Sequence, residues 1–262
     1  MNYHKNHEYI ASTLLKQYDK SPLKAKAYIE GDVNTDTPAM MIGRVFHEMM
    51  DGSETFIIFD PENRPEPTKT FGSKLNKEWK DSIYTSGKDV VSIDEYNNLA
   101  NMVSSITASK FYNKLLGGVK LESKEKGYYT EVAGCKIKCK PDALYEGAND
   151  SIICVDWKST SEKLTADRWQ YNRVIKKYGY DLSAVHYSEV LYNHFKKDVH
   201  FFLLFVESAE PYDVMPVYIN RQGEMYQQTF DRWIAAVQGL TKCLTTGEWP
   251  TIESQVNNYI EF

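Results

Sequence analysis

Two aspartates and a lysine on either side of one short turn are the residues best suited to chemistry. Asp142 follows Pro141, and Asp156 and Lys158 interrupt the otherwise apolar run IICVDWK. If the turn is centred near Asn149, the two aspartates stand opposite each other in an antiparallel hairpin. Residues opposed in this way point to the same face, with Cβ atoms about 5 Å apart. Lys158 lies two residues beyond Asp156 and projects from that face as well.

Two carboxylates that face each other across neighbouring strands repel unless a positive charge neutralises them. A hard divalent cation with oxygen ligands does this, which favours Mg²⁺, with Mn²⁺ as a substitute. Lys158 would then orient or deprotonate a water molecule, or balance charge on a phosphate. The alternative is structural: Lys158 forms a salt bridge with one aspartate, and the other lies exposed at a strand end. The hairpin geometry leaves both interpretations open.

A second candidate lies upstream, in the segment GRVFH. Gly43 and His47 are four residues apart and therefore share one face of a helix. A glycine inside a helix costs about 1 kcal/mol relative to alanine, so we expect another backbone to approach Gly43 closely. His47 would then reach the carboxylates and ligate the metal. A histidine satisfied within the core is the alternative.

A third candidate is Tyr187, one helical turn after Ser183. We expect this helix to follow the strand that carries Asp156. Tyr187 would then contact a phosphate or position Lys158. A tyrosine that only lines the core is the alternative interpretation.

The elements that must position these residues change in kind along the chain. Residues 51–80 are expected to form a short extended segment and an exposed loop. Helices are predicted at 7–17, 21–29, 38–50, 93–116, 162–177, 182–195 and 224–246, and strands at 128–132, 135–145, 152–157, 200–206 and 214–220. This order predicts an α/β fold, with a mixed central β-sheet that contains an antiparallel meander and is flanked by helices. We expect one domain over 1–262, helical to about 120, with a sheet core over about 121–222 and a helix and tail over 223–262.

The composition limits the class of protein. With 31 basic and 36 acidic residues the net charge is −5, which is not the basic footprint of most nucleic-acid binders. It does not exclude such a role, because carboxylates that hold metal add negative charge and a basic surface can be confined to one groove. No apolar run approaches the roughly 20 residues of a membrane span. The polar N-terminus predicts a cytoplasmic protein, and the four cysteines are expected to be free thiols.

Taken together, these motifs resemble the PD-(D/E)xK nuclease superfamily, whose core is that of the restriction endonucleases. Pro141-Asp142 followed by Asp156-Trp157-Lys158 matches its central signature in the D-x-K variant. The Gly43 to His47 segment and the stretch around Tyr187 resemble flanking motifs of its RecB-like subset. Looser likenesses near both ends, including the segment GEWP, resemble phage and prophage exonucleases of the RecE (exonuclease VIII) type.

The resemblance implies roles for particular residues. His47, Asp142, Asp156 and the carbonyl of Trp157 would hold Mg²⁺. Asp142, Asp156, Lys158 and Tyr187 would form the catalytic set. Ser183 stands where the family has glutamine, which puts that residue's contact in doubt. A further acidic residue often precedes the hairpin, and the candidates are Glu122, Glu125 and Glu131.

The resemblance also implies an activity. Such a protein would be a Mg²⁺-dependent exodeoxyribonuclease that digests one strand of linear double-stranded DNA from 5′ to 3′. It would act on DNA ends in the cytoplasm of a bacterial host, as a homo-oligomeric ring. Its single-stranded product would pass to a RecT-like single-strand annealing protein for recombination.

Two alternatives remain. An iron–sulfur nuclease of the same superfamily needs one cysteine upstream and three near the C-terminus. Here Cys135, Cys139 and Cys154 lie in the expected sheet and only Cys243 is C-terminal. The second alternative is a non-catalytic DNA-binding or assembly protein that retains the nuclease fold. The presence of Asp142, Asp156 and Lys158 argues against it.

Overall fold

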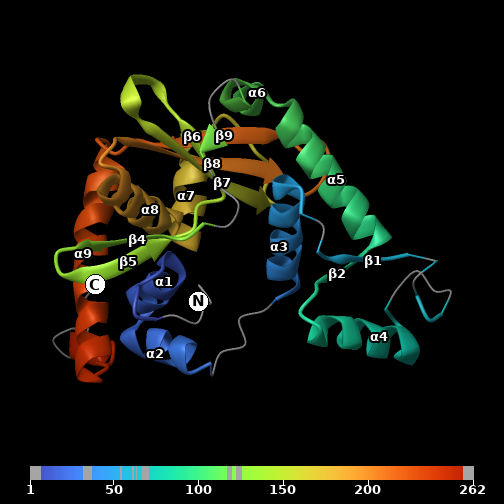
Figure 1. Cartoon of the computed structure of the whole chain (residues 1–262), viewed down its shortest axis with the longest axis horizontal. Helices are drawn as coiled ribbons and strands as arrows, with labels where there is room; N and C mark the ends of the chain where they lie inside the picture. The colour runs from blue at the N-terminus through green and yellow to red at the C-terminus, as the bar shows by residue number, and fades with distance from the viewer. Residues whose placement is uncertain are drawn as a thin grey trace.

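The computed structural model describes residues 7–31, 37–53, 55–60, 62, 64–66, 71–116, 120–121 and 126–255. Its centre is a five-stranded sheet with the strand order β3-β6-β7-β8-β9 (Figure 1). Strands β6 and β7 are antiparallel, β7 and β8 are parallel, and β8 and β9 are antiparallel. The predicted mixed sheet flanked by helices is therefore confirmed. The strands are β3 (Lys120–Leu121), β6 (Ala143–Glu146), β7 (Ile152–Thr160), β8 (Val199–Glu207) and β9 (Val214–Ile219).

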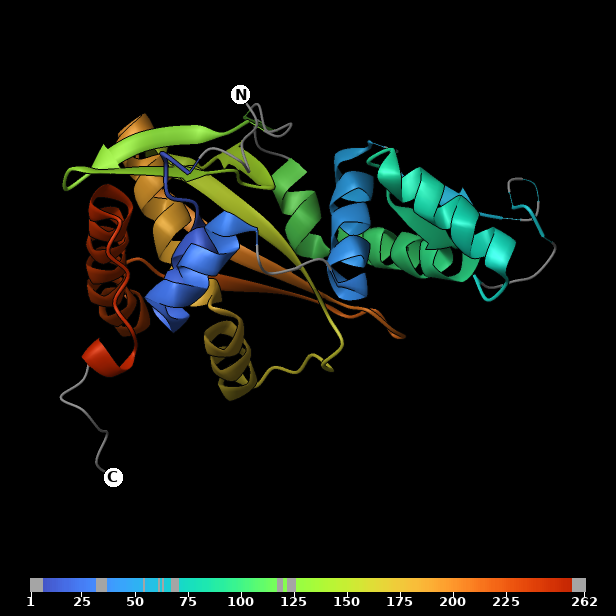
Figure 2. The same ribbon diagram turned by 90° about the horizontal axis from the view of Figure 1, so that it is seen from below.

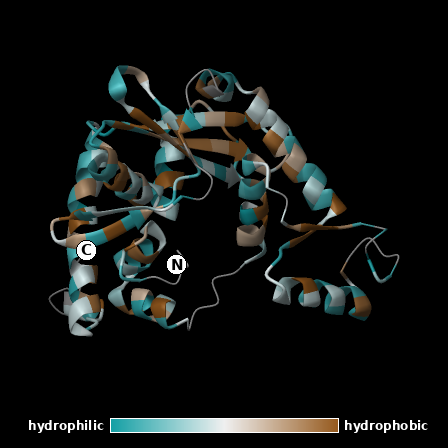
Figure 3. Cartoon of the chain, in the orientation of Figure 1, coloured by the Kyte–Doolittle hydropathy of each residue, from teal (hydrophilic) through white to brown (hydrophobic). Residues whose placement is uncertain are grey.

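The sheet separates two hydrophobic cores. Its central strands β7 and β8 are rich in β-branched and aromatic residues, as expected for strands covered on both faces. Because neighbouring residues of a strand point to opposite faces, Cys154 packs in one core and Val155 in the other. In Figure 3 the strands of this sheet are mostly brown, which marks its apolar character.

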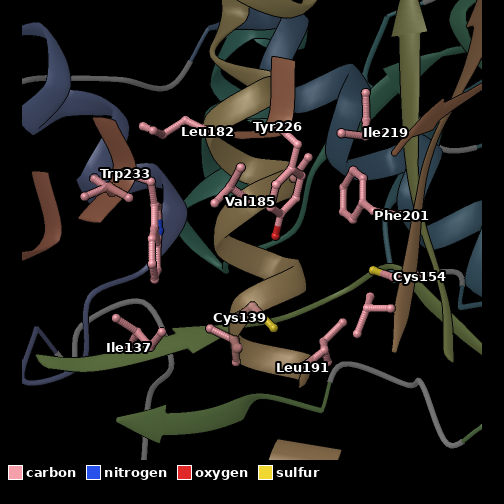
Figure 4. Close-up of a cluster of buried hydrophobic side chains, with 14 of the residues drawn as sticks. Ile137, Cys139, Cys154, Leu182, Val185, Leu191, Phe201, Ile219, Tyr226 and Trp233 are labelled. Atoms are coloured by element: carbon pink, nitrogen blue, oxygen red, sulfur yellow. The ribbon is translucent and has the colours of Figure 1, made fainter. Parts of the chain in front are cut away.

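The first core is built around helix α8 (Tyr180–Phe195), which is buried along most of its length. Helix α8 packs against α1 (Ser12–Lys20), α7 (Arg168–Tyr178) and α9 (Glu224–Thr246). Figure 4 shows side chains of α8 and α9, among them Val185 and Trp233, together with Phe201 of the sheet. Helix α2 (Pro22–Glu30) continues from α1 where a helix over 21–29 was predicted, with Ser21 as its N-cap and Pro22 at its first position.

The second core lies on the other face of the sheet. It is formed by α3 (Pro38–Asp51), α5 (Ile93–Ala108) and α6 (Lys110–Leu116) with a parallel pair of strands, β1 (Ile57–Phe59) and β2 (Val90–Ser92). Together with α4 (Lys74–Thr85), the helices α3 and α5 lie at one end of the molecule, away from α9 (Figure 2). Ser92 and Glu95 form a reciprocal capping box that fixes the start of α5.

One hairpin lies outside the central sheet. Within the residues that the structure describes, strands β4 (Tyr128–Val132) and β5 (Cys135–Cys139) pair only with each other, apart from a single bridge between Ile10 and Ile137. The predicted strand over 135–145 is wrong, because β5 ends at Cys139 and β6 begins at Ala143. Pro141 lies in this break, where its missing backbone N–H removes a hydrogen-bond donor. The break frees the chain to leave one sheet and enter the next.

The helices differ from the prediction in two starting residues, one additional helix and one interruption. The first helix begins at Ser12 rather than at residue 7, and the loop expected over 51–80 contains the start of α4, which Ser73 caps. The single helix expected over 93–116 is interrupted at Ser109, whose backbone is extended. The helix expected from 162 begins at Arg168, because β7 continues beside β8 as far as Thr160.

No helix in the described ranges combines the length and apolar composition that crossing a membrane requires.

Candidate functional site

The hairpin of β6 and β7 has the register predicted from the sequence. Ala143 pairs with Val155 and Leu144 with Cys154. Continued by one residue, this register places Asp142 opposite Asp156 at the end of the hairpin. Asp142 lies one residue before β6 and extends the pairing through its side chain. Its Oδ2 accepts a hydrogen bond of 2.8 Å from the Trp157 backbone N–H.

Asp156 and Lys158 are polar residues that follow apolar residues on the same face of β7. The preceding residues on that face of β7, Ile152 and Cys154, are buried in the first core. Asp156 is only 5% exposed and forms an ion pair with the Lys158 ammonium. The Lys158 Nζ also donates to the backbone carbonyl of Trp157 over 3.2 Å. The sequence-based expectation that these side chains share one face is confirmed.

His47 reaches the same place from the other side of the cavity. Val45 and Phe46 are fully buried in the second core and anchor α3. His47 Nδ1 lies 3.1 Å from Asp142 Oδ1, so the helix delivers the imidazole to the first aspartate. The interpretation of Gly43 was wrong: a Cβ added there would meet no atom within 4 Å. Gly43 borders open space in the cavity rather than a close backbone.

The electrostatics of the four groups follow from burial and mutual charge. The pKa of Asp156 is raised. Burial raises it most, the negative charge of Asp142 raises it further, and the ammonium of Lys158 lowers it by less than these two together. For Asp142 burial acts in the same direction, but His47 and Lys158 outweigh it and lower the pKa. The pKa values of His47 and Lys158 are raised, because the carboxylates outweigh the burial that alone would lower them. A buried carboxylate, Asp156, and a partly buried one, Asp142, thus face the Lys158 ammonium and the His47 imidazole.

The donor set suits a divalent cation. Two carboxylates, the Trp157 carbonyl and an imidazole are ligands that Mg²⁺ or Mn²⁺ accepts. The buried Asp156 Oδ2 has the Lys158 ammonium beside it but no regular hydrogen bond with any described residue. In the described part of the chain, no three His, Cys, Asp or Glu side chains are already arranged to hold a metal ion. His47 and Lys158 lie against the carboxylates instead, so a metal would have to displace these contacts.

The four groups line a cavity of about 930 Å³. Its walls come from α1, α3, the β6–β7 hairpin and the start of α8. Tyr187 and Ser183 line this cavity as well. The aromatic ring beside Lys158, however, is that of Tyr180, with 5.4 Å between Nζ and the ring centroid. The ring of Tyr187 instead makes an edge contact with Phe201 at 6.0 Å between centroids.

Among the cavity residues that sequence reasoning missed are Lys16 on α1 and Tyr180 on α8. Lys16 has the pattern of an ordinary surface lysine on an amphipathic helix. Tyr180 directly follows Gly179, the left-handed cap between α7 and α8. Gly179 was the residue in the sequence that could have indicated a sharp turn next to the site.

Of the three glutamates expected near the site, Glu131 is excluded from the cavity. Glu131 is exposed on β4, opposite Lys136, and does not line the cavity. Glu122 and Glu125 lie outside the described residues. Glu48 of α3 does line the cavity, and its Oε2 accepts hydrogen bonds from the Thr55 backbone and hydroxyl.

The cysteines show no sign of a cluster. All four are free and buried. Burial raises the pKa of Cys139 and Cys154 well above the ordinary value, which keeps them as neutral thiols. They behave as small core side chains.

Comparison with known proteins gives a family and a fold. A family model described as a PDDEXK-like domain of unknown function (DUF3799) matches residues 11–261. A solved structure from Eubacterium rectale, described as a "Putative exonuclease", has 14% sequence identity and a TM-score of 0.63, and the match covers 99% of this chain and 92% of that chain. The structure of SSO0001 is 12% identical, and the match covers 80% of this chain and 85% of that chain. Its TM-score of 0.32 is too low to indicate a shared fold. No curated protein matches. At these identities the structural likeness concerns the fold alone.

Proposed function

The chain belongs to the family of PDDEXK-like domains of unknown function (DUF3799), and from this premise we propose that it is a divalent-metal-dependent nuclease that hydrolyses phosphodiester bonds of DNA. The observation that carries the proposal is the meeting of Asp142, Asp156 and Lys158 at the end of the β6–β7 hairpin, with His47 opposite them. A carboxylate buried to this degree is costly for folding. A pair of them in one cavity calls for a role beyond stability.

The proposed metal ligands are His47, Asp142, Asp156 and the Trp157 carbonyl. When bound, Mg²⁺ or Mn²⁺ would act as a Lewis acid on the phosphate and make water a stronger nucleophile. Asp142 is held in place by the Trp157 N–H and by His47. Both contacts favour its ionised form, which is the form that binds cations.

Lys158 supplies the positive charge for the reaction. Its ammonium sits between the Asp156 carboxylate, the Trp157 carbonyl and the ring of Tyr180. The raised pKa keeps it protonated near neutral pH. A fixed and mostly buried cation stabilises the charge that builds on phosphate oxygens as water attacks. We assign Tyr187 to the cavity wall that holds the substrate.

We further propose that the enzyme is an exonuclease that degrades one strand of linear duplex DNA from 5′ to 3′. The support is the resemblance of its motifs to RecE-type exonucleases and the fold shared with the E. rectale protein. In this proposal the enzyme acts in the cytoplasm of a bacterial host and assembles into a ring. Its single-stranded product passes to a RecT-like annealing protein. A ring would spread weak phosphate contacts over several subunits, which suits a chain of net charge −5.

The test is digestion of linear duplex DNA that carries a fluorophore at the 5′ or the 3′ end of one strand. With Mg²⁺ or Mn²⁺ we expect release of small labelled products from the 5′ end first, and none with EDTA. A covalently closed circular duplex is the matched substrate without ends. Its cleavage would replace the exonuclease by an endonuclease. No cleavage of any DNA with either metal would favour the non-catalytic DNA-binding protein.

A further inference from the structure

Lys16 is a second cation in the wall of the catalytic cavity. It projects from α1 toward the ring of Tyr180, and its Nζ lies 5.9 Å from the ring centroid. Lys158 Nζ lies 5.4 Å from the same centroid. Lys158 is neutralised by Asp156, whereas Lys16 makes no ion pair or hydrogen bond with any residue that the structure describes.

The position of Lys16 is built into the fold. Gly179 separates α7 from α8 with a left-handed φ of 64°. A Cβ on Gly179 would lie 3.0 Å from Lys16 Cδ and 3.3 Å from Lys16 Cγ. The glycine therefore makes room for the aliphatic stem of the lysine. The stem thus packs on this turn, and the ammonium group lines the cavity.

An unpaired ammonium in this place is unfavourable without an anion. Burial, and then the charge of Lys158, lower the pKa of Lys16 to about 8, although Asp156 and Asp181 oppose this shift. Lys16 is partly buried. A partly buried charge without an ion pair is unfavourable, and a second like charge near the same ring adds to the cost. A bound phosphate would neutralise Lys16 and remove this cost.

We propose that Lys16 binds a second phosphate of the DNA strand whose scissile phosphate lies at Lys158. This inference rests on the proposed nuclease function and names the group that holds the strand in register. Two cations on one tyrosine ring then contact two phosphates of one strand.

The experiment measures binding of a short fluorescent DNA duplex over a series of KCl concentrations, with Ca²⁺ in place of Mg²⁺ so that the DNA stays intact. Lys16→Met keeps the stem but removes the charge. We expect binding at low salt to weaken about fivefold, because a phosphate contact and its counterion release are lost. The slope of log Kd against log salt should fall by about one. Lys16→Arg should restore the slope.

Lys20→Met is the matched control, since Lys20 is exposed, lies one turn along α1 and does not line the cavity. It should leave the slope unchanged. Without DNA, the melting temperature of Lys16→Met should be no lower than that of the wild type, because methionine replaces a partly buried cation that has no ion pair. A wild-type slope in Lys16→Met, or an equal loss in Lys16→Met and Lys16→Arg, overturns the inference while cleavage by the wild type stands. Absence of cleavage by the wild type overturns the proposed function, and this inference with it.

Discussion

Asp156 stands in β7 directly after Cys154 and Val155, two fully buried side chains, at a position that would favour a hydrophobic residue. A charged group there needs Lys158 to compensate for lost hydration, and the pair is less stabilising than well-packed apolar residues of the same volume. The stability of the fold therefore does not explain this carboxylate, whereas binding of a cation would explain it.

Replacing Asp156 by asparagine separates these two roles. Asp156→Asn keeps the size of the side chain but removes one of the two carboxylates, so we expect DNA cleavage with Mg²⁺ to fall roughly a thousandfold. The fold should persist, because the remaining charge of Asp142 still faces Lys158 and His47. Initial rates of duplex degradation and far-UV circular dichroism give the two readouts.

The control is the same substitution in the turn of the same hairpin. Asp150 is exposed, pairs with Lys197 and lies away from the cavity, so Asp150→Asn should retain the wild-type rate. Equal rates for Asp156→Asn and the wild type would remove Asp156 from the chemistry.

At the scale of elements, the sequence predicts best where the signal is local. The β6–β7 register follows from one turn and two short apolar strands, so Asp142 and Asp156 could be matched correctly. Helix α4 escaped prediction although Leu75, Trp79 and Ile83 recur at the four-residue spacing of an amphipathic helix. This stripe is short and lies among many charged residues, which favoured a loop. The site residue Lys16 escaped for a different reason. Only the packing of α1 on the Gly179 turn distinguishes it from Lys20.

His186 of α8 lies between β5 and α9, and its contacts predict how the free energy of unfolding depends on pH. His186 is fully buried; its Nε2 lies 2.9 Å from the Lys138 carbonyl, and its Nδ1 accepts from the Trp233 indole N–H over 3.1 Å. This arrangement requires a neutral ring with its proton on Nε2. Burial lowers the pKa of His186 to about 4, from 6.5 in the unfolded chain. Its stabilising contribution is therefore fully present above pH 6.5 and is lost as the pH falls toward 4.

The expected loss is about 3 kcal/mol in the free energy of unfolding between the two ends of this window. Urea unfolding at several pH values measures it, with His186→Gln as the variant that cannot gain the proton. The stability difference between wild type and variant should shrink as the pH falls. A difference that stays constant with pH would show that His186 is not held neutral by the fold.

At the scale of the whole molecule, the cavity joins the two cores. His47 comes from α3 in the second core, the aspartates come from the sheet, and Tyr180 comes from α8 in the first core. A ligand bound by His47 and both aspartates thus connects α3 with the central sheet. The unfolded chain cannot assemble such a set, so binding must favour the folded state.

Metal binding should therefore stabilise the protein in a site-specific way. At a Mn²⁺ or Mg²⁺ concentration about 100 times the dissociation constant, the gain is about 2.7 kcal/mol, which raises the melting temperature of a chain of this size by roughly 5–10 °C. Thermal melts at constant ionic strength, with KCl replacing the metal salt, measure this shift. Asp150→Asn should show the wild-type shift and Asp156→Asn little of it, because only the latter loses a ligand. If Asp156→Asn gained as much as the wild type, the ion would be acting elsewhere on this acidic chain, and the two aspartates would be left as partners of His47 and Lys158 alone.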